Sequence, residues 1–360
     1  MRKLLALLIL FFPLNVFAIS ASSAIVMDLD TGRVLYGYNT NEQKLIASTT
    51  KIMTALVAID KGKLDEEIEV SDIIYKAYGS AIYIEVGEKL TLKDLLYGLI
   101  LRSGNDAALV IAEYISGSVE EFVYLMNEYA DNLGMDNTIF YNPHGLEESN
   151  GNANKSTTFD MAKLTKYAME NSDFREIFKT KSYTVKTNYK TYVWHNKNKL
   201  LSLDYITGGK TGYTELARRT LVSTGSKDNM NVVVVTLNDP NDWADHKTLY
   251  ENVFNNYQSY EILNKDKFEV DNNREYYASD KLFIKNSYNM TLTKDELKKV
   301  RLNVNLMKLN DYIDDTQVGY VEVKLIDVVY HKEPIYVIKK TADKESLSWW
   351  QKFRSWLFKW

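Results

Sequence analysis

Residues 208–237 read GGKTGYTELARRTLVSTGSKDNMNVVVVTL, and this segment carries the clearest strand pattern in the chain. It predicts a three-strand meander that ends in the β-branched run of residues 231–237. Apolar residues at helical spacing precede it at residues 158–171 and follow it at residues 245–257. We therefore expect an α+β domain in which an antiparallel sheet is flanked by helices.

Toward the N-terminus, residues 25–27 and 33–36 predict a hairpin in which Gly32 is free to take a positive φ angle. The tripeptide Ser103-Gly104-Asn105 interrupts a helical pattern before another helix begins near Asp106. This tripeptide is therefore expected in a loop between two helices. Further helices are predicted at residues 49–61, 91–101 and 119–133.

The two ends of the chain have distinctive compositions. Residues 1–18 combine a basic start, an apolar run and the small-residue cleavage site Val16-Phe17-Ala18, which predicts a secretory signal peptide. Residues 343–360 place tryptophans and other apolar residues on one helical face and basic residues on the rest. Because this segment is too short and too charged to span a bilayer, we expect an amphipathic helix that anchors the protein in the membrane plane. The protein is thus predicted to be secreted across the cytoplasmic membrane and to remain peripheral on its outer face.

Beyond residue 262 the character of the sequence changes. Residues 301–306 and 320–325 alternate apolar and polar positions with period two, which predicts a small all-β domain. The expected organisation is a signal peptide at 1–18, a catalytic domain at 19–262, an all-β domain at 263–342 and a membrane anchor at 343–360.

The composition of the chain excludes several classes of partner and of catalytic site. The chain has 360 residues, a formal net charge of −4 and a sequence pI near 5.8, so no nucleic-acid partner is expected. It contains no cysteine, which excludes disulfides, a thiolate nucleophile and cysteine-ligated metal centres. Its four histidines are scattered, and no Gly-x-Ser-x-Gly, His-Glu-x-x-His or phosphate-loop motif occurs. We expect neither a metal nor an organic cofactor.

A candidate nucleophile lies in Ser48-Thr49-Thr50-Lys51, where a serine and a lysine are one helical turn apart and share a face. A serine hydroxyl attacks poorly unless a base removes its proton, and a lysine is a base only when it is neutral. Burial and a second cation nearby both favour the neutral form. The pair alone is weak support, because a capped amphipathic helix also accounts for it.

Two further motifs follow in the chain, Ser103-Gly104-Asn105 and Lys210-Thr211-Gly212. Together the three resemble the S-x-x-K, S-x-N and K-T-G motifs of the penicillin-recognising active-site serine enzymes. The segments at residues 28–36, 101–108, 142–146 and 208–214 are similar to those of one branch, the low-molecular-mass D-alanyl-D-alanine carboxypeptidases of peptidase family S11. The signal peptide, the β domain and the tail resemble that branch too. The resemblance implies a β-lactamase/transpeptidase-like catalytic domain followed by the all-β domain and the C-terminal amphipathic helix.

The resemblance also implies roles for these residues. The catalytic residues are Ser48 as nucleophile, Lys51 as its base and Ser103 as the relay that carries the proton to the leaving amine. The substrate-binding residues are Asn105, Lys210, Thr211, Gly212 and Tyr213, where Asn105 holds a substrate amide, Lys210 and Thr211 bind the terminal carboxylate, and the N–H groups of Ser48 and Tyr213 form the oxyanion hole. The expected substrate is a peptidoglycan pentapeptide ending in D-Ala-D-Ala, and β-lactams are expected as covalent inhibitors.

Some positions depart from the family pattern. Arg218 stands where a glycine is commoner, and no arginine occurs around Asp242-Trp243, where some members place a second carboxylate contact. Arg218, Arg219 or His246 are the candidates to replace it. We expect residues 142–146, which include His144, to form a structural turn near the site.

Alternative functions remain on the same fold. A β-lactamase uses the same motifs, although the β domain and the anchor argue against it. An endopeptidase that cuts cross-links is a further variant, and outside enzymes a non-catalytic wall-binding protein is the alternative. The three intact motifs argue against this non-catalytic alternative.

Overall fold

The computed structural model describes residues 19–270, 276–277 and 280–339. The chain forms two compact units, the first ending at Asn256 and the second beginning at Tyr257. The predicted boundary after residue 262 therefore falls inside β12 (Gln258–Leu263), the first strand of the second unit. The predicted signal peptide and the predicted anchor at 343–360 lie outside the described residues.

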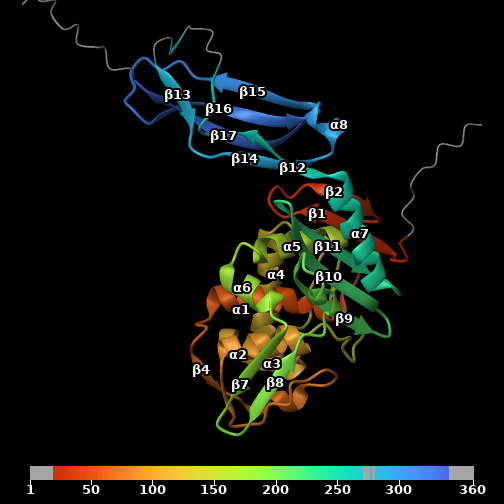
Figure 1. The fold of residues 1–360 in the computed structure, drawn as a ribbon. Coiled ribbons are helices and arrows are strands. Elements are labelled where there is room, and N and C mark those ends of the chain that lie inside the picture. Colours follow the sequence, from red (N-terminus) through yellow and green to blue (C-terminus); the bar gives the residue numbers. More distant parts are fainter. Residues whose placement is uncertain (1–18, 271–275, 278–279, 340–360) are drawn as a thin grey trace, which may run out of the picture. The chain divides into compact units, whose positions relative to one another are not determined.

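The first unit is built around a five-stranded antiparallel sheet in the order β2-β1-β11-β10-β9 (Figure 1). The predicted meander forms its last three strands, and the predicted hairpin forms its first two. All but one residue of β11 are buried, because helices cover both faces of the sheet at this central position. The strands are β1 (Ser23–Asp28), β2 (Val34–Tyr38), β9 (Ile206–Thr214), β10 (Arg218–Lys227) and β11 (Met230–Leu237).

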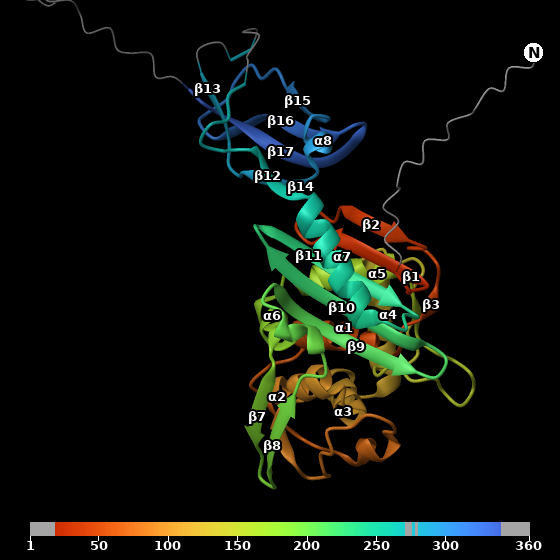
Figure 2. The same cartoon turned by 45° about the vertical axis from the view of Figure 1, so that its right-hand side comes forward.

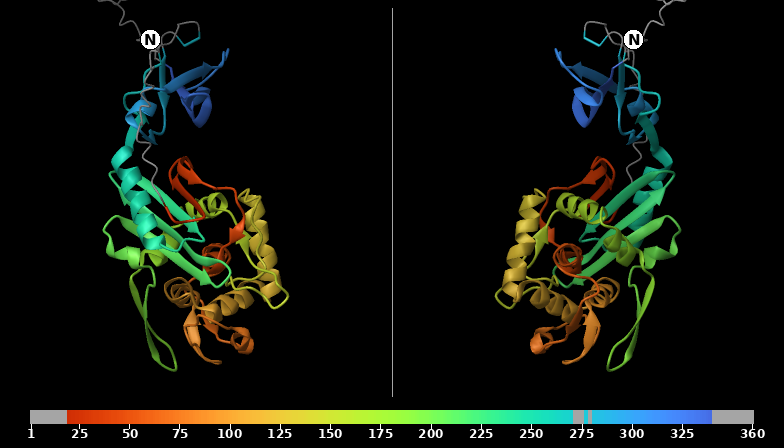
Figure 3. Two further views of the ribbon diagram at one scale, coloured as in Figure 1. Left: turned by 90° about the vertical axis from the view of Figure 1, so that its right-hand side faces the viewer. Right: turned by 90° about the vertical axis from the view of Figure 1, so that its left-hand side faces the viewer.

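Helices pack on both faces of this sheet (Figures 2 and 3). Helix α5 contacts β1 and β11 on one face, and α7 packs on β10 and β11 on the other. The large apolar core lies on the α5 side, between the sheet and the remaining helices. The helices are α1 (Lys51–Lys61), α2 (Leu92–Tyr97), α3 (Asn105–Ser116), α4 (Val119–Asn132), α5 (Thr158–Ala168), α6 (Ser172–Lys179) and α7 (Asp242–Asn256).

Short elements complete the first unit and shape its site. The predicted helix at 91–101 starts at a capping box formed by Thr91 and Asp94, but α2 ends at Tyr97 and a π-helical turn, η3 (Gly98–Arg102), follows. The 3₁₀ turns are η1 (Ala47–Thr50), η2 (Asp72–Lys76) and η4 (Lys199–Ser202). Three two-stranded pairs are β3 (Lys44–Leu45) with β6 (Lys155–Ser156), β4 (Glu67–Glu69) with β5 (Lys89–Thr91), and β7 (Ser182–Lys186) with β8 (Thr191–His195).

The second unit is dominated by strands, as its period-two sequence predicts. A four-stranded antiparallel sheet has the order β13-β17-β16-β15, and β12 pairs with β14. Buried residues such as Val321, Val323 and Ile335 form a core separate from that of the first unit. The elements are β13 (Lys281–Ile284), β14 (Tyr288–Leu292), α8 (Lys294–Leu297), β15 (Val300–Leu306), β16 (Thr316–Leu325) and β17 (Val328–Ile338). In the part of the chain that is described, no helix is both long enough and apolar enough to cross a bilayer.

Candidate active site

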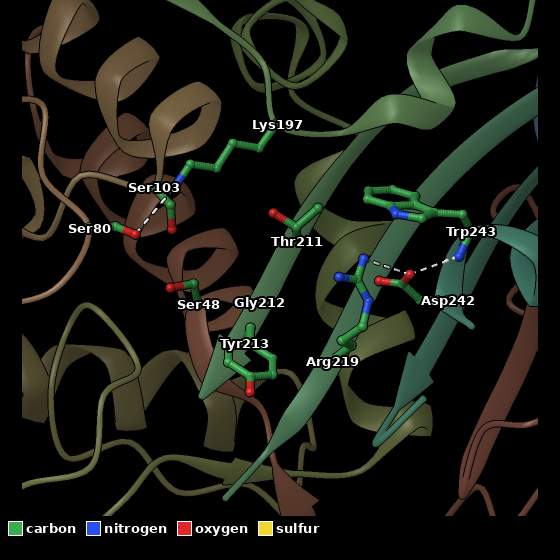
Figure 4. A pocket seen from close by; sticks show the side chains of 10 residues that line it. All are labelled: Ser48, Ser80, Ser103, Lys197, Thr211, Gly212, Tyr213, Arg219, Asp242 and Trp243. Atoms are coloured by element: carbon green, nitrogen blue, oxygen red, sulfur yellow. Dashed lines mark hydrogen bonds and ion pairs between the residues drawn. The ribbon is translucent and has the colours of Figure 1, made fainter. Parts of the chain in front are cut away.

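A cavity of about 300 Å³ lies beside β9, an edge strand of the five-stranded sheet (Figure 4). Its lining side chains come from η1, β9, β10 and the start of α7, and from the loops that hold Ser80, Ser103 and Lys197. The residues that line it are Ser48, Ser80, Ser103, Lys197, Thr211, Gly212, Tyr213, Arg219, Asp242 and Trp243. The cavity thus brings together members of all three sequence motifs.

Ser48 lies in the tight turn η1, directly before α1. Ala47 adopts a left-handed φ of 47°, which turns the chain sharply into the helix. The carbonyl of Ile46 accepts hydrogen bonds from Thr49 Oγ1 at 2.6 Å and from Thr220 Oγ1 of β10 at 3.0 Å. This turn is therefore attached to the sheet, and it holds Ser48 at the cavity wall.

Lys51 lies one helical turn after Ser48 and is fully buried. Its Nζ donates to Ser48 Oγ at 3.1 Å, to Asn105 Oδ1 at 2.7 Å and to the His144 carbonyl at 2.7 Å. Burial, together with the charges of Lys210 and Lys197, holds the pKa of Lys51 well below its ordinary value. A neutral amine within hydrogen-bond distance of a serine hydroxyl can accept the proton of that hydroxyl.

Lys210 and Ser103 form a second buried pair across the cavity. Ser103 follows η3 with a left-handed φ of 64°, and this places its side chain in the cavity rather than along a helix. Lys210 Nζ donates to Ser103 Oγ at 3.0 Å and to the Thr211 carbonyl at 2.6 Å. Burial and the nearby charge of Lys197 lower the pKa of Lys210 to about 7.

Asn105 is held where the loop from residue 78 to residue 83 meets the start of α3. Its Nδ2 donates to the Tyr78 carbonyl, and its backbone N–H donates to the Ser80 carbonyl at 2.7 Å. The neighbouring Asp106 carboxylate accepts hydrogen bonds from the N–H groups of Ile82 at 3.0 Å and Tyr83 at 2.8 Å. The Asn105 side chain is consequently fixed at 1% exposure, with its Oδ1 on Lys51.

Gly212 allows β9 to pass close to the serine turn. A Cβ atom at this position would lie 2.9 Å from the Ser48 nitrogen and 2.3 Å from Thr220 Oγ1. Since real Cβ atoms do not approach backbone this closely, a larger residue here would push β9 away from Ser48. Tyr213 follows with its side chain 52% exposed at the rim, where its hydroxyl donates to Glu215 Oε1 at 2.9 Å.

The turn at residues 142–146 lies beside the site and contacts Lys51 through the His144 carbonyl. Besides Lys51, the His144 carbonyl accepts a longer hydrogen bond from Ser48 Oγ at 3.4 Å. Burial and the Lys51 charge lower the pKa of His144 to about 3, so its imidazole is neutral. The backbone oxygen of His144 therefore contributes to the site. No motif in the sequence points to this carbonyl.

Arg219 and Trp243 form the far wall of the cavity, beyond Thr211 (Figure 4). Arg219 Nη2 donates to the buried Asp242 Oδ1 at 2.8 Å, and its guanidinium lies 5.4 Å from the centre of the Trp243 ring. These two contacts hold the guanidinium against the cavity.

Two of the three candidates for a second carboxylate contact do not line the cavity. Arg218 lies on the surface near Glu215. His246 is fully buried between Ser223 and Thr236, at 2.7 and 3.0 Å. Arg219 is the candidate that reaches it.

Sequence reasoning did not single out Lys197 and Ser80. Lys197 Nζ donates to Ser80 Oγ at 3.2 Å, and both residues line the cavity. Neither belongs to a sequence motif described above, and the two are 117 positions apart in the chain. Burial of its ammonium and the Arg102 charge lower the pKa of Lys197.

Comparisons with known proteins agree with this geometry. Residues 13–241 match the family model for D-alanyl-D-alanine carboxypeptidase, peptidase S11. The chain is 39% identical over 222 residues to D-alanyl-D-alanine carboxypeptidase DacF of Bacillus subtilis, which covers 60% of this chain and 56% of that protein. It is 38% identical over 240 residues to a D-alanyl-D-alanine carboxypeptidase of Streptomyces sp. K15, covering 61% of this chain and 81% of that protein. The crystal structure of penicillin-binding protein 5 from Haemophilus influenzae superposes with a TM-score of 0.73 at 26% identity, covering 90% and 98% of the two chains.

Proposed function

Because the chain belongs to the peptidase S11 family of D-alanyl-D-alanine carboxypeptidases, we propose that it releases the terminal D-alanine of peptidoglycan stem peptides through an acyl-enzyme on Ser48. The observation that carries this proposal is the position of Lys51. Its Nζ lies 3.1 Å from Ser48 Oγ, and burial lowers its pKa, which favours the neutral amine. No other serine among those lining the cavity has a fully buried lysine one helical turn away.

In the acylation step, Lys51 accepts the hydroxyl proton while Ser48 Oγ attacks the carbonyl carbon of the penultimate D-alanine. The backbone N–H groups of Ser48 and Tyr213 stabilise the resulting oxyanion. The C–N bond then breaks, and the proton that Lys51 accepted passes through Ser103 to the leaving amine, which leaves Lys51 neutral for the next step. Support for this relay is the hydrogen bond between Ser103 Oγ and Lys210 at 3.0 Å.

In deacylation, water takes the place of Ser48 as the nucleophile, and Lys51 again acts as the base. A water molecule attacks the ester carbonyl, Lys51 removes a proton from the water, and Ser48 regains its proton as the C–O bond breaks. A β-lactam presents a strained amide to the same nucleophile and acylates Ser48 in the same way. Family membership supports this inhibition.

The terminal carboxylate of the substrate binds at Thr211, Lys210 and Arg219. Lys210 Nζ donates to the Thr211 carbonyl, and Arg219 lines the cavity with Thr211, so a carboxylate bound at Thr211 has two cationic groups nearby from which to accept charge-assisted hydrogen bonds. Recognition of this group restricts the enzyme to the C-terminal residue of a peptide. Asn105 holds the amide of the preceding residue.

Intact-mass measurement of the purified protein tests the nucleophile. Wild-type protein is expected to gain one penicillin and to release D-alanine from a diacetylated Lys-D-Ala-D-Ala peptide, whereas Ser48→Ala does neither. The exposed Ser202→Ala variant is the matched control and keeps both reactions. An adduct that clears within minutes would point to a β-lactamase. A folded protein with neither adduct nor D-alanine release would contradict the proposal and leave a wall-binding role.

A second variant tests carboxylate binding. Arg219→Gln is expected to raise KM for the peptide about 10- to 100-fold with little change in kcat, because a charge-assisted hydrogen bond present in both ground and transition states is lost. The adjacent Arg218→Gln, which does not line the cavity, is the control. Equal KM values for the two variants would remove Arg219 from the carboxylate site.

The position in the cell follows from the family and from the two chain ends. Members of this family act on the cell wall, and we propose that the predicted signal peptide exports the chain while the tail at residues 343–360 holds it on the outer face of the membrane. Fractionation of cells expressing the full chain and a chain lacking residues 343–360 tests this. The tail-less chain is expected in the soluble fraction, and its retention with membranes would contradict the anchor.

A further inference from the structure

A second polar cluster lies outside the active site, where the first described residues meet α7. Asp239 and Asp245 are 0% and 7% exposed. Ser20 bridges them, because its Oγ donates to Asp239 Oδ1 at 3.0 Å and to Asp245 Oδ2 at 2.8 Å. The backbone N–H groups of Ser20 and Ala21 also donate to Asp245 Oδ2, at 2.6 and 3.2 Å. Two buried carboxyl groups thus face one short segment of backbone.

This pair of carboxyl groups lacks a cation. Within the described residues, neither Asp239 nor Asp245 forms an ion pair, and Asp239 Oδ2 is buried without a hydrogen-bond donor. Asp242 and Tyr36 also interact with Asp245, and neither carries a positive charge. Burial, and to a smaller extent the adjacent Asp245, raise the pKa of Asp239 to about 6. Two buried carboxylates without a cation are costly, so this cluster favours a positively charged ligand.

Such a ligand becomes available when the predicted signal peptide is removed. Hydrolysis of the bond after Ala18 by a signal peptidase consumes one water, leaves a carboxylate on Ala18 and leaves a free amine on Ile19. An α-amino group with an ordinary pKa of about 7.7–8.0 takes up a proton at neutral pH. The Ile19 nitrogen is three bonds from the Ser20 nitrogen, so the two are at most about 3.7 Å apart.

We propose that Asp239 and Asp245 form the binding site for the α-ammonium group of Ile19 in the processed protein. The Ser20 nitrogen is already 2.6 Å from Asp245 Oδ2, so rotation about the Ile19 backbone brings the new ammonium within reach of the same carboxyl pair. An ammonium has three N–H donors, enough for the unpaired Asp239 Oδ2 and for Asp245. The site rests on the predicted cleavage after Ala18 and is independent of the proposed catalytic activity.

The site also connects the processed end to the wall of the cavity. The Asp239 N–H donates to the Arg219 carbonyl at 2.9 Å, and Asp239 Oδ1 accepts from the Asn241 N–H at 3.0 Å. The ammonium therefore binds the loop that joins β11 to α7, directly behind the residue that lines the cavity. We accordingly expect cleavage to stabilise this junction.

A double-mutant cycle tests the site. Full-length mature chains that begin at Ile19 or at a Gly-Ser-Gly-Ser extension of Ile19 are compared with and without the substitutions Asp239→Asn and Asp245→Asn. The extension is expected to lower Tm by about 2–4 °C in the wild-type background. It should leave Tm unchanged in the Asn background. Asp65→Asn, on the surface of the same unit, is the control and should keep the full effect of the extension.

Equal effects of the extension in both backgrounds would overturn the proposal, since the pair would then be neutralised by a shared proton. A protein from cells that begins at a residue other than Ile19 would also overturn it. If the Asn variants do not fold, the pKa of the Ile19 amino group, followed by NMR of the wild-type chain, decides the question. A value above the ordinary range supports the site, and an ordinary value contradicts it.

Discussion

Lys51 can act as a base because of its surroundings rather than its chemical type. Its ammonium form has no solvent contact, and Lys210 and Lys197 add positive potential to the same cavity. The hydrogen-bond acceptors around Nζ are neutral oxygens of Asn105, His144 and Ser48, so no carboxylate in direct contact restores the charge. Depression of a lysine pKa by burial and like charge is a recurring way to activate a nucleophile at neutral pH.

Lys197 tunes this base from the opposite side of the cavity. Its positive charge lowers the pKa of both Lys51 and Lys210. In Lys197→Gln both lysines hold their protons to a higher pH, so the acidic limb of the kcat/KM profile is expected to move to higher pH and activity near pH 6 to fall. The rate of penicillin acylation, measured as a function of pH, gives the position of this acidic limb directly.

The exposed Lys199→Gln variant, two residues away, is the control for that measurement. An unchanged profile in Lys197→Gln would mean that the charge at this position does not reach the base.

Five of the eight residues predicted for the site line the cavity, and the other three, Lys51, Asn105 and Lys210, are buried behind them. These residues could be picked out because they lie in or next to short motifs with a recognisable spacing in the sequence. His144 is different, because the atom that matters is a backbone oxygen, which any residue type supplies. Lys197 reaches the cavity from the β8–η4 loop, and Arg219 reaches it from β10. Their positions at the cavity depend on the tertiary structure and not on a local sequence pattern. For the same reason His246 of α7, chemically suitable for a carboxylate, is buried against β10 and β11, where Ser223 and Thr236 contact its ring nitrogens.

The turn at residues 142–146 depends on Gly145. This glycine has a φ of +90°, and a Cβ atom there would lie 1.9 Å from the Ala47 carbonyl oxygen, next to the nucleophile. Gly145→Ala is expected to lower stability by at least about 2 kcal/mol and to slow penicillin acylation, because relief of the clash moves either Ala47 or the His144 carbonyl. Denaturation and acylation rates measure the two effects.

Gly151→Ala is the matched control for the Gly145→Ala variant. Its φ of +87° carries the same conformational cost, but no atom lies within 4 Å of the added methyl group. If both variants lose acylation equally, backbone strain rather than the contact with Ala47 is responsible.

The long strands and helices of the first unit were predictable because their apolar periodicity is local. The end of α2 was not: the periodicity continues to residue 101, but the backbone widens into the π-helical turn η3 and Ser103 takes a left-handed conformation. That irregularity directs Ser103 at Lys210, so packing against distant residues prevails over local preference. The two-residue strands β3 and β6 also have no local signal, because they form through pairing between segments distant in the sequence.

Each unit has its own apolar core, so damage to one core should remain local. Ile335→Ala, in the second unit, removes a fully buried side chain and is expected to destabilise that unit by about 2–5 kcal/mol. Penicillin acylation of Ser48 should be unchanged. Ile25→Ala, at a fully buried position of the first unit, should instead lower the melting temperature of the penicillin-reactive form. Loss of acylation in the Ile335 variant would show that the cores are not independent.

The groups around Ser48 come from segments far apart in the chain, since Lys51 and Asn105 are 54 positions apart and Ser103 and Lys210 are 107 positions apart. No local piece of the polypeptide assembles them, so an unfolded chain carries only serines and lysines of ordinary reactivity. On the proposed export route, a chain that has not yet folded would accordingly leave cell-wall precursors in the cytoplasm untouched. Folding itself then controls where the enzyme is active, because the active site forms only where the chain reaches its native state.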